Sequence, residues 1–160
     1  MTRITIRPAE AADAGRLNTA LRALSDHLND THYASDEKIA QAGFGESPSF
    51  SAILAELGED VVGVAVFSPI FSTTRGTPGV FVSDLWVATS QRGNGLGRNL
   101  LAAVCNFSAD KWDAAFLRLN VYRDNRAAIA AYEKLGFDTD LHEAVMTLNF
   151  GEFNVLRANR

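Results

Sequence analysis

Apolar residues recur at helical spacing in the first part of the chain, after a short β-prone segment. Residues 3–7 predict a strand that ends at Pro8, because proline cannot continue a sheet ladder. From Glu10 onward the apolar residues return every three or four positions, as in a helix that buries one side; they are Leu17, Ala20, Leu21, Leu24 and Leu28. A second, shorter helix is predicted over residues 36–42, with Gly43 ending it.

The period then changes to that of β-strands. Phe50–Leu57 and Val61–Ile70 are rich in β-forming residues, and Gly58-Glu59-Asp60 between them indicates a hairpin. Ser72–Gly79 contains a proline and two glycines, so we expect a loop there. Val80–Val87, dense in β-branched and aromatic side chains, is predicted to be the next strand.

The second half continues with alternating helices and strands. A stripe of Leu96, Leu100, Val104 and Phe107 predicts a helix. Ala114–Val121 is predicted to be a strand and Asn125–Leu135 a helix that Gly136 ends. The stretch from Phe137 onward, including Val145–Phe150, predicts one or two closing strands. The order β-α-α-β-β-β-α-β-α-β-(β) indicates a mixed α/β sheet in one domain spanning residues 1–160.

Composition supports one globular domain and excludes few functions. The chain has 160 residues, of which 47% are hydrophobic and 21% charged, and its net charge is −4. Neither a membrane-spanning stretch nor a secretory signal is recognisable, and the single cysteine, Cys105, allows no internal disulfide and is expected to be buried on its helix. We therefore expect a cytoplasmic protein that binds neither membranes nor, given its acidic balance, nucleic acid. His27, His32 and His142 fit no metal-ligand spacing, so no metal is expected.

A glycine-rich segment between the predicted strand 80–87 and the following helix is the most specific feature. Three glycines alternate here, and glycine lets a backbone turn tightly and approach a ligand closely. The first amides of a helix lack intrahelical acceptors and carry partial positive charge, so this junction favours a phosphate or pyrophosphate. The candidate ligand-binding residues are Gln91, Arg92, Gly93, Asn94, Gly95, Leu96, Gly97 and Arg98.

Other phosphate-binding motifs do not fit this segment. A P-loop needs Gly-x-x-x-x-Gly-Lys-[Ser/Thr], and no such run exists in the chain. A dinucleotide fingerprint needs Gly-x-Gly-x-x-Gly, but Arg98 stands at the third glycine position counted from Gly93. The plain alternative is a strand–helix connection that uses glycine only to turn.

Two motifs together resemble the GNAT superfamily of N-acetyltransferases. Arg92-Gly93-Asn94-Gly95-Leu96-Gly97 matches the family's [Gln/Arg]-x-x-Gly-x-[Gly/Ala] pattern. Further on, the run from Asn125 to Phe137 is similar to the family's Asn-x-x-Ala-x-x-x-Tyr-x-x-x-Gly-Phe pattern. The resemblance spans roughly residues 3–150. It implies a mostly antiparallel central sheet of six to seven strands, flanked by about four helices and splayed between strands four and five.

The resemblance also implies a cosubstrate and site residues. Acetyl-CoA would bind where the strands splay, with its pyrophosphate on the glycine segment and its pantetheine on the backbone of Leu85, Trp86 and Val87. Asn125 would hold the pantetheine arm. Tyr132, seven residues later and therefore on the same helix face, would act as general acid towards the departing thiolate. The alternative for Tyr132 is a packing role in the core.

The general base is less well defined by the sequence. Asp84 is an acidic residue within an otherwise apolar and aromatic strand, which points to function or to a structural hydrogen bond. The N-terminal half, including Arg7, Asp13 and the run 42–48, looks like the diamine acetyltransferase branch, which includes spermidine/spermine and thialysine acetyltransferases. That branch has glutamate where this chain has Ser83, and Asp84 is then the retained acid.

The expected function is therefore acetyl transfer to a primary amine of a small molecule, by direct transfer in a ternary complex. The branch resemblance implies a homodimer. The acceptor would be a polyamine, diamine or amino-acid-like amine, and His27 or His32 could contribute near it. The alternatives are acetylation of a protein N-terminus or lysine, and a CoA-binding regulatory module without catalytic activity, which the Ser83 departure keeps open.

Overall fold

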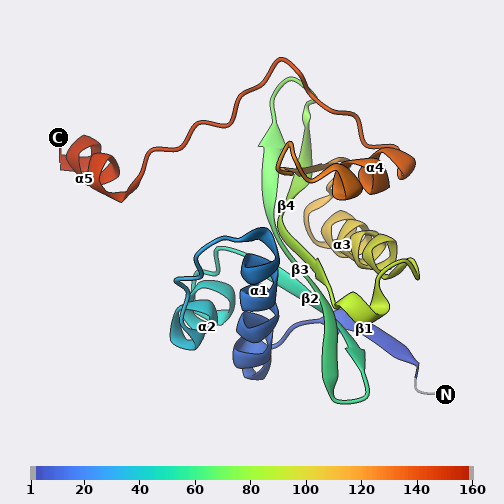
Figure 1. The fold of residues 1–160 in the computed structure, drawn as a ribbon. Helices are drawn as coiled ribbons and strands as arrows, with labels where there is room; N and C mark the ends of the chain where they lie inside the picture. Colours follow the sequence, from blue (N-terminus) through green and yellow to red (C-terminus); the bar gives the residue numbers. More distant parts are fainter. Residues whose placement is uncertain (1–2, 159–160) are drawn as a thin grey trace. The chain divides into compact units, whose positions relative to one another are not determined.

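The computed structural model describes residues 3–158, which form two units that meet at the Val121–Tyr122 bond. The first unit contains a five-stranded sheet, three α-helices and two short 3-10 helices (Figure 1). Its elements are β1 (Ile4–Pro8), η1 (Ala11–Asp13), α1 (Ala14–Leu28), α2 (Asp36–Phe44), β2 (Ser51–Leu57), β3 (Asp60–Ser72), β4 (Thr77–Val87), η2 (Thr89–Gln91), α3 (Leu96–Trp112) and β5 (Leu117–Leu119). The second contains α4 (Arg126–Lys134) and α5 (Phe150–Ala158).

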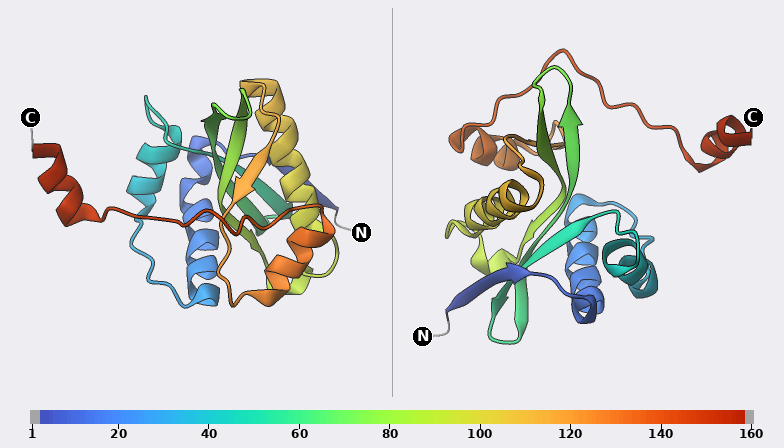
Figure 2. Two further views of the ribbon diagram at one scale, coloured as in Figure 1. Left: turned by 90° about the horizontal axis from the view of Figure 1, so that it is seen from above. Right: turned by 180° about the vertical axis from the view of Figure 1, so that it is seen from behind.

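The sheet follows the chain in the order β1-β2-β3-β4-β5. The first three pairings are antiparallel, and β5 alone runs parallel to its neighbour β4. Helices α1 and α2 cover one face of the sheet and α3 the other (Figures 1 and 2). Both faces are therefore covered at the centre, which is why Ala52–Ala55 and Val62–Phe67 are continuous buried apolar runs rather than alternating ones.

Two hydrophobic layers result. Leu17 and Leu21 of α1 pack with Leu54 and Val64 on one face of the sheet. On the other face, Phe67 makes edge-to-face contacts with Phe107 and Trp112 of α3, with ring centroids 5.3 and 6.0 Å apart.

The hairpin predicted at Gly58-Glu59-Asp60 is present, and Leu57 pairs with Asp60 across a two-residue turn in which Gly58 has a φ of 65°. The loop predicted over Ser72–Gly79 is shorter than expected. Thr77, Pro78 and Gly79 belong to β4 and pair with the end of β3, so only residues 73–76 turn.

Three other sequence-based boundaries or placements were wrong. Gly43 lies inside α2 rather than ending it, because the ring of Phe50 occupies the place where a Cβ would stand. The strand predicted over Ala114–Val121 is only the three residues of β5. Cys105 is exposed on α3 instead of buried.

The second unit differs most from expectation. No strand forms within residues 122–158, so the sheet has five strands rather than six to seven, and the closing strand predicted at Val145–Phe150 is absent. Phe150 instead begins α5, which makes five α-helices rather than about four. Helix α4 ends as expected: Gly136 has a φ of 95°, and the amide of Phe137 donates to the carbonyl of Tyr132 over 3.1 Å, closing a Schellman motif.

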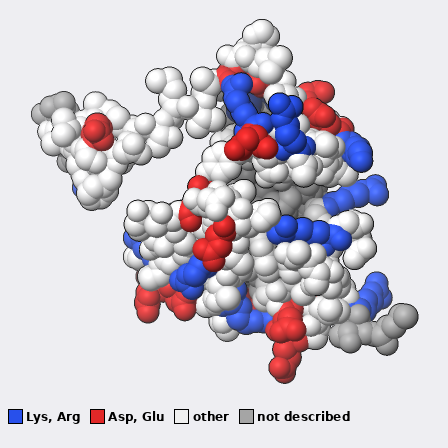
Figure 3. Space-filling model, in the orientation of Figure 1, with Lys and Arg blue, Asp and Glu red and all other residues white. Residues whose placement is uncertain are grey.

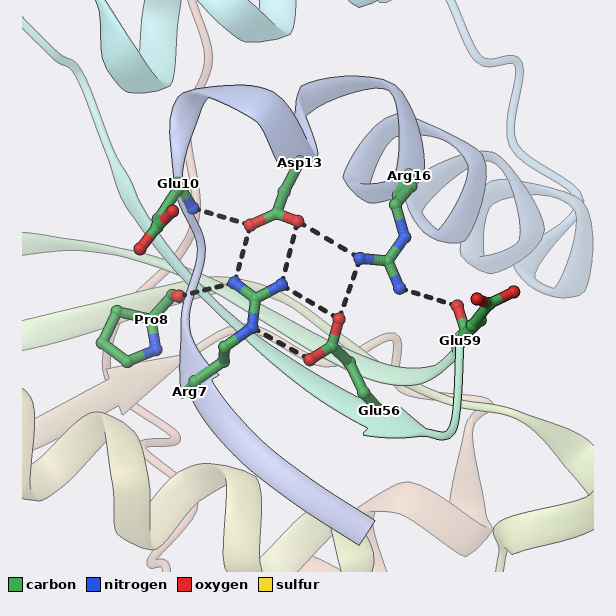
Figure 4. Close-up of polar contacts among 7 residues, drawn as sticks. All are labelled: Arg7, Pro8, Glu10, Asp13, Arg16, Glu56 and Glu59. Atoms are coloured by element: carbon green, nitrogen blue, oxygen red, sulfur yellow. Dashed lines mark hydrogen bonds and ion pairs between the residues drawn. The ribbon is translucent and has the colours of Figure 1, made fainter.

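A four-residue ion-pair network ties β1, β2 and the start of α1 together (Figure 4). The guanidinium of Arg7 donates to both oxygens of Asp13, at 2.7 and 3.0 Å, and to both oxygens of Glu56, at 2.9 Å each. Arg16 bridges the same two carboxylates at 3.2 and 2.8 Å. These bonds hold the pKa of Asp13 at about 2 and lower that of Glu56, chiefly through hydrogen bonds from Arg7. Each carboxylate of the network is paired with both guanidinium groups, so the network has a structural role.

Replacing Arg7 with methionine is expected to lower the free energy of unfolding by about 2–3 kcal/mol at pH 7, because two carboxylates then face each other with one cation fewer. Since both carboxyl pKa values are lowered in the folded state, the wild-type contribution is complete above pH 4 to 5 and is lost as pH falls towards 2. Urea unfolding at pH 7 and pH 3 measures both effects, with Arg22→Met on the exposed side of α1 as control. If Arg7→Met lowered the free energy of unfolding equally at the two pH values, this role of the network would be contradicted.

Candidate active site

The end of β4 has a strand on one side only. Leu85, Trp86 and Val87 pair with Ala65, Val64 and Gly63 of β3. On the other side, β5 pairs only with Val80–Val82 and then ends, so among the described residues no strand accompanies Ser83–Val87 there. This stretch presents backbone N–H and C=O groups to whatever lies beside it, which is the splay predicted between strands four and five.

A β-bulge marks the point where the two strands part. Val66 pairs with Asp84 but Phe67 pairs with Val82, so Ser83 is the extra residue on β4. A bulge breaks the strict alternation of a strand, so Ser83 and Asp84 are not constrained to opposite faces. The Ser83 hydroxyl donates to the Val66 carbonyl at 3.3 Å.

Asp84 is a half-buried carboxyl group in this position. Burial raises its pKa above the usual value for aspartic acid, and a hydrogen bond from Ser83 and the charge of a protonated His32 act in the opposite direction. A carboxylate with a raised pKa is a better proton acceptor than an exposed one, which suits a general base. The catalytic role of Asp84 stays a prediction, and His32 lies near enough for its charge to act on this carboxyl group.

His32 is held by a polar network that sequence reasoning did not identify. Its Nε2 lies 2.8 Å from Oδ1 of Asn18, and its Nδ1 lies 3.0 Å from the Ser25 hydroxyl. Asn18 is fully buried, and its amide nitrogen donates to the Ala34 carbonyl and to Asp36, at 3.1 and 2.7 Å. Asn18 therefore presents its oxygen to His32, which fixes a proton on Nε2. The only signal in the sequence was a polar residue on the apolar stripe of α1. His27, the other predicted candidate, is exposed near the end of α1.

The glycine segment forms an open turn at the start of α3. Gly93 and Gly95 have φ values of 77° and 78°, and no atom lies within 4 Å of the place where either Cβ would stand. Gly95 is the N-cap residue of α3, without a capping side chain, so the first-turn amides of the helix keep their donor capacity. The turn is therefore shaped for the close approach of an anion and is not filled by the chain's own side chains.

The turn is anchored next to the end of β4. The Arg92 guanidinium donates from Nε to the Val87 carbonyl at 2.9 Å, and a Cβ on Gly97 would lie 3.9 Å from the Val87 side chain. Leu96 points into the core, so only its backbone can serve a ligand, whereas Asn94 and Arg98 are exposed and Gln91 is half-buried. The first unit thus brings together the predicted segment 91–98, the stretch Leu85–Val87 and Asp84.

Asn125 and Tyr132 both belong to the second unit, at the start of α4 and within it respectively. Asn125 stands just before α4 rather than within it, and its side-chain oxygen accepts from the amide of Ala128 at 3.2 Å, as an N-cap does. Its side-chain nitrogen remains a donor. Tyr132 is half-buried, its ring centroid lies 5.4 Å from that of Phe137, and burial raises the pKa of its hydroxyl. The hydroxyl therefore keeps its proton at neutral pH.

Residues 3–158 contain neither a metal-binding cluster nor a helix suited to span a membrane. No set of three or more His, Cys, Asp or Glu side chains is grouped so that it could bind a metal ion. Likewise, no helix in that range combines the length and the hydropathy needed to cross a membrane.

Comparison with known proteins gives consistent results. Residues 19–137 match the model of the acetyltransferase (GNAT) family. The thialysine N-ε-acetyltransferase of Sus scrofa is 32% identical over 154 residues, covering 90% of this chain and 89% of that protein. The enzyme of the same name from Mus musculus is 31% identical over 160 residues, covering 94% of the chain and 92% of that protein.

Solved structures share the fold at lower identity. An integron cassette protein from the mobile metagenome of V. cholerae superposes with a TM-score of 0.81 at 20% identity, covering 99% of both chains. An aminoglycoside N-acetyltransferase in complex with CoA superposes with a TM-score of 0.74 at 18% identity, covering 94% of this chain and 96% of that one.

Proposed function

Because the chain belongs to the GNAT family and is an N-acetyltransferase, we propose that it transfers the acetyl group of acetyl-CoA to the terminal amine of a small amino acid or diamine. The observation that carries this proposal is the unaccompanied end of β4 beside an uncapped, open helix start. The first can pair with the amides of a pantetheine chain, and the second can bind a pyrophosphate.

Residues of the first unit fit acetyl-CoA in separate ways. The amides at the start of α3 would bind the pyrophosphate, with Arg92 and Arg98 adding charge. The backbone of Leu85–Val87 would bind the pantetheine and donate to the thioester oxygen, where negative charge develops. Bound acetyl-CoA supplies the acetyl thioester that the amine attacks. In the second unit, the Asn125 amide nitrogen would donate to the pantetheine.

Asp84 and Tyr132 would move the two protons of the reaction. A primary amine is protonated at neutral pH and must lose a proton before it can attack, and Asp84 would accept that proton directly or through water. The attack forms the C–N bond and breaks the C–S bond, and Tyr132 would then donate its proton to the departing thiolate. The second proton of the attacking nitrogen leaves as the amide forms and would restore the Tyr132 hydroxyl. The amine would attack and the CoA thiolate would leave within one ternary complex, so no acetylated side chain is needed.

The names of the curated relatives support the proposed acceptor class. Those that cover most of this chain carry the name thialysine N-ε-acetyltransferase, and thialysine is an amino acid with a terminal amine. Asp84 provides a carboxylate that can pair with the protonated terminal amine. The diamine branch has a second acid at the position of Ser83, and serine provides no charge there. A single carboxylate favours an acceptor with one free ammonium group at the reacting end over a long polyamine.

The test is the release of free thiol from acetyl-CoA in the presence of thialysine, lysine, spermidine, an aminoglycoside and a peptide. We expect turnover with thialysine and lysine to exceed that with spermidine. Turnover with the peptide alone would identify a protein acetyltransferase and contradict the proposal. Acetyl-CoA binding, measured by calorimetry, with no turnover on any amine would identify a non-catalytic module.

A matched pair of glycine variants tests the cosubstrate site in the same assay. Gly95→Val is expected to raise the KM for acetyl-CoA roughly tenfold or more, because the side chain fills the approach and strains the turn. Gly76→Val imposes similar strain at a φ of 66°, also in open space, but in the β3–β4 turn. Equal effects of the two substitutions would show that strain alone is responsible.

A further inference from the structure

His32 lies in the loop that joins α1 to α2, and this loop is fixed at both ends. Asn29 ends α1 with a φ of 58°. At the other end, the Ser35 hydroxyl accepts from the amide of Lys38 at 3.2 Å and caps α2. His32 is half-buried between these two anchors, and both nitrogens of its ring are bonded to side chains of α1.

The hydrogen bonds around His32 accommodate a ring with two N–H groups. The Asn18 amide nitrogen already donates to two oxygens, so its Oδ1 must accept from Nε2 of the ring. The Ser25 hydroxyl can donate to the Leu21 carbonyl at 3.2 Å while it accepts from Nδ1 of the ring at 3.0 Å. A second proton on the ring therefore leaves no donor without an acceptor.

Asp36 adds a negative charge to this arrangement. Its Oδ1 lies 2.7 Å from the Asn18 amide nitrogen, at the other end of the amide from His32. Hydrogen bonds in a chain polarise one another, so an ionised Asp36 makes Asn18 Oδ1 a stronger acceptor for the ring N–H. Both N–H groups of a protonated ring thus have acceptors, and the acceptor of one of them is strengthened by an anion.

Asp84 lies on the sheet face that α1 and α2 cover. It pairs with Val66, and Trp86, two residues further along β4, pairs with Val64. Side chains of directly paired residues, and of alternate residues in a strand, point to the same face. Val64, Val66 and Trp86 all pack in the hydrophobic layer formed with α1 and α2. The Asp84 carboxyl therefore lies on the side of the sheet where the α1–α2 loop holds His32.

His32 is the charged group that acts on this carboxyl. Arg16 of α1 is engaged in the ion-pair network of Figure 4, and β3 carries no titratable side chain beyond its first residue. From Arg22 to Lys38, every titratable side chain except His32 is exposed. On the face drawn in Figure 3, acidic and basic side chains of the first unit are interspersed. Exposed charges are screened by water and salt, so the half-buried His32 dominates the field at Asp84.

On the basis of the general-base role proposed for Asp84, we propose that His32 is its positioning residue: Asn18 and Ser25 hold the ring so that its positive charge keeps the Asp84 carboxyl ionised in mildly acidic solution. A base must be ionised to take the proton of the amine, so this charge would extend turnover towards lower pH. A histidine side chain ordinarily carries its second proton below about pH 6.5, the range in which a buried aspartate takes up its own. Because both ring nitrogens are bonded to α1, His32 acts through Asp84 and takes no proton from the substrate.

His32→Gln removes the charge with little change in the hydrogen bonds. A glutamine amide can donate to Asn18 and accept from Ser25, as a neutral histidine does. The acid limb of the kcat/KM profile is expected to move to higher pH by roughly 0.5–1 unit, a loss of roughly three- to tenfold near pH 5 that disappears above about pH 8. His27→Gln, at an exposed position of α1, should leave the profile unchanged. A loss that is equal at every pH would identify a purely structural role and overturn the proposal.

The pairing also has a measurement that depends neither on turnover nor on a substitution of His32. In an NMR titration of the His32 ring signals, Asp84→Asn should move the midpoint to lower pH by roughly 0.5–1 unit, because the interaction of two charges acts equally on both. Asp110→Asn, at an exposed position of α3, should not move it. An unchanged midpoint in the Asp84 variant would overturn the proposal even if Asp84 is catalytic. A shifted midpoint in a protein that acetylates no amine would confirm the charge pair and contradict the proposed function instead.

Discussion

Replacing Asp84 with asparagine is expected to lower kcat/KM by roughly 10²–10⁴-fold at neutral and mildly acidic pH. The loss should shrink as pH rises towards the pKa of the free amine, near ~10, because the amine then needs no base. In the unmodified enzyme the rate should rise as pH passes the pKa of Asp84, which burial raises. Rate profiles between pH 5 and pH 10 measure both effects.

The control for this substitution is Asp110→Asn, an exposed aspartate on α3 that should leave the profile unchanged. Acetyl-CoA binding should be unaffected in the Asp84 variant, which separates loss of the base from loss of the fold. If the two enzymes differ by a constant factor across the whole pH range, Asp84 has a structural role and takes no proton.

Tyr132→Phe is expected to reduce kcat by roughly 10²–10³-fold while leaving the KM for acetyl-CoA nearly unchanged, because only the proton for the leaving thiolate is lost. Burial raises the pKa of the Tyr132 hydroxyl above its ordinary value, so the unmodified enzyme should keep this acid through the neutral range and lose activity only as the group ionises in strong base. Steady-state kinetics from pH 7 to pH 11 reports the difference.

Tyr33→Phe provides the matched control, since Tyr33 is 90% exposed in the loop before α2. An acetyl thioester whose thiol is more acidic needs less help from an acid, so the Tyr132 variant should recover part of its rate with such a donor. Full activity of Tyr132→Phe with acetyl-CoA would leave only the packing contact with Phe137 as its role.

The sequence predicted features that depend on neighbours along the chain. The hairpin at Gly58 follows from a glycine that accepts a positive φ, and the end of α4 at Gly136 follows for the same reason. Family motifs added the site residues, and the structure places segment 91–98 next to Leu85–Val87 within the first unit.

Features that depend on distant partners were missed. From the sequence, Gly43 was predicted to end a helix. In the structure, glycine is required there because the Phe50 ring lies where a Cβ would stand. The bulge at Ser83 is set by the register with β3, which no local pattern reveals. Likewise, the support of His32 by Asn18 joins residues 14 positions apart.

The strand predicted at Val145–Phe150 failed for a related reason. The alternation of side chains was read correctly, but alternation states only what a segment could do beside a sheet edge. The segment pairs with no strand of the sheet, and Val145 and Met146 are exposed while Phe150 begins α5.

The early end of β5 after Leu119 has a consequence for how the fold is completed. Within residues 3–158, no strand pairs with Ser83–Val87 on the β5 side. In the proposed function, the pantetheine chain of acetyl-CoA would take the place of the missing strand, so the sheet would be completed by a molecule that is consumed at every turnover. Part of the enzyme's thermal stability should then come and go with its cosubstrate, and its resistance to unfolding in a cell would follow the supply of that metabolite.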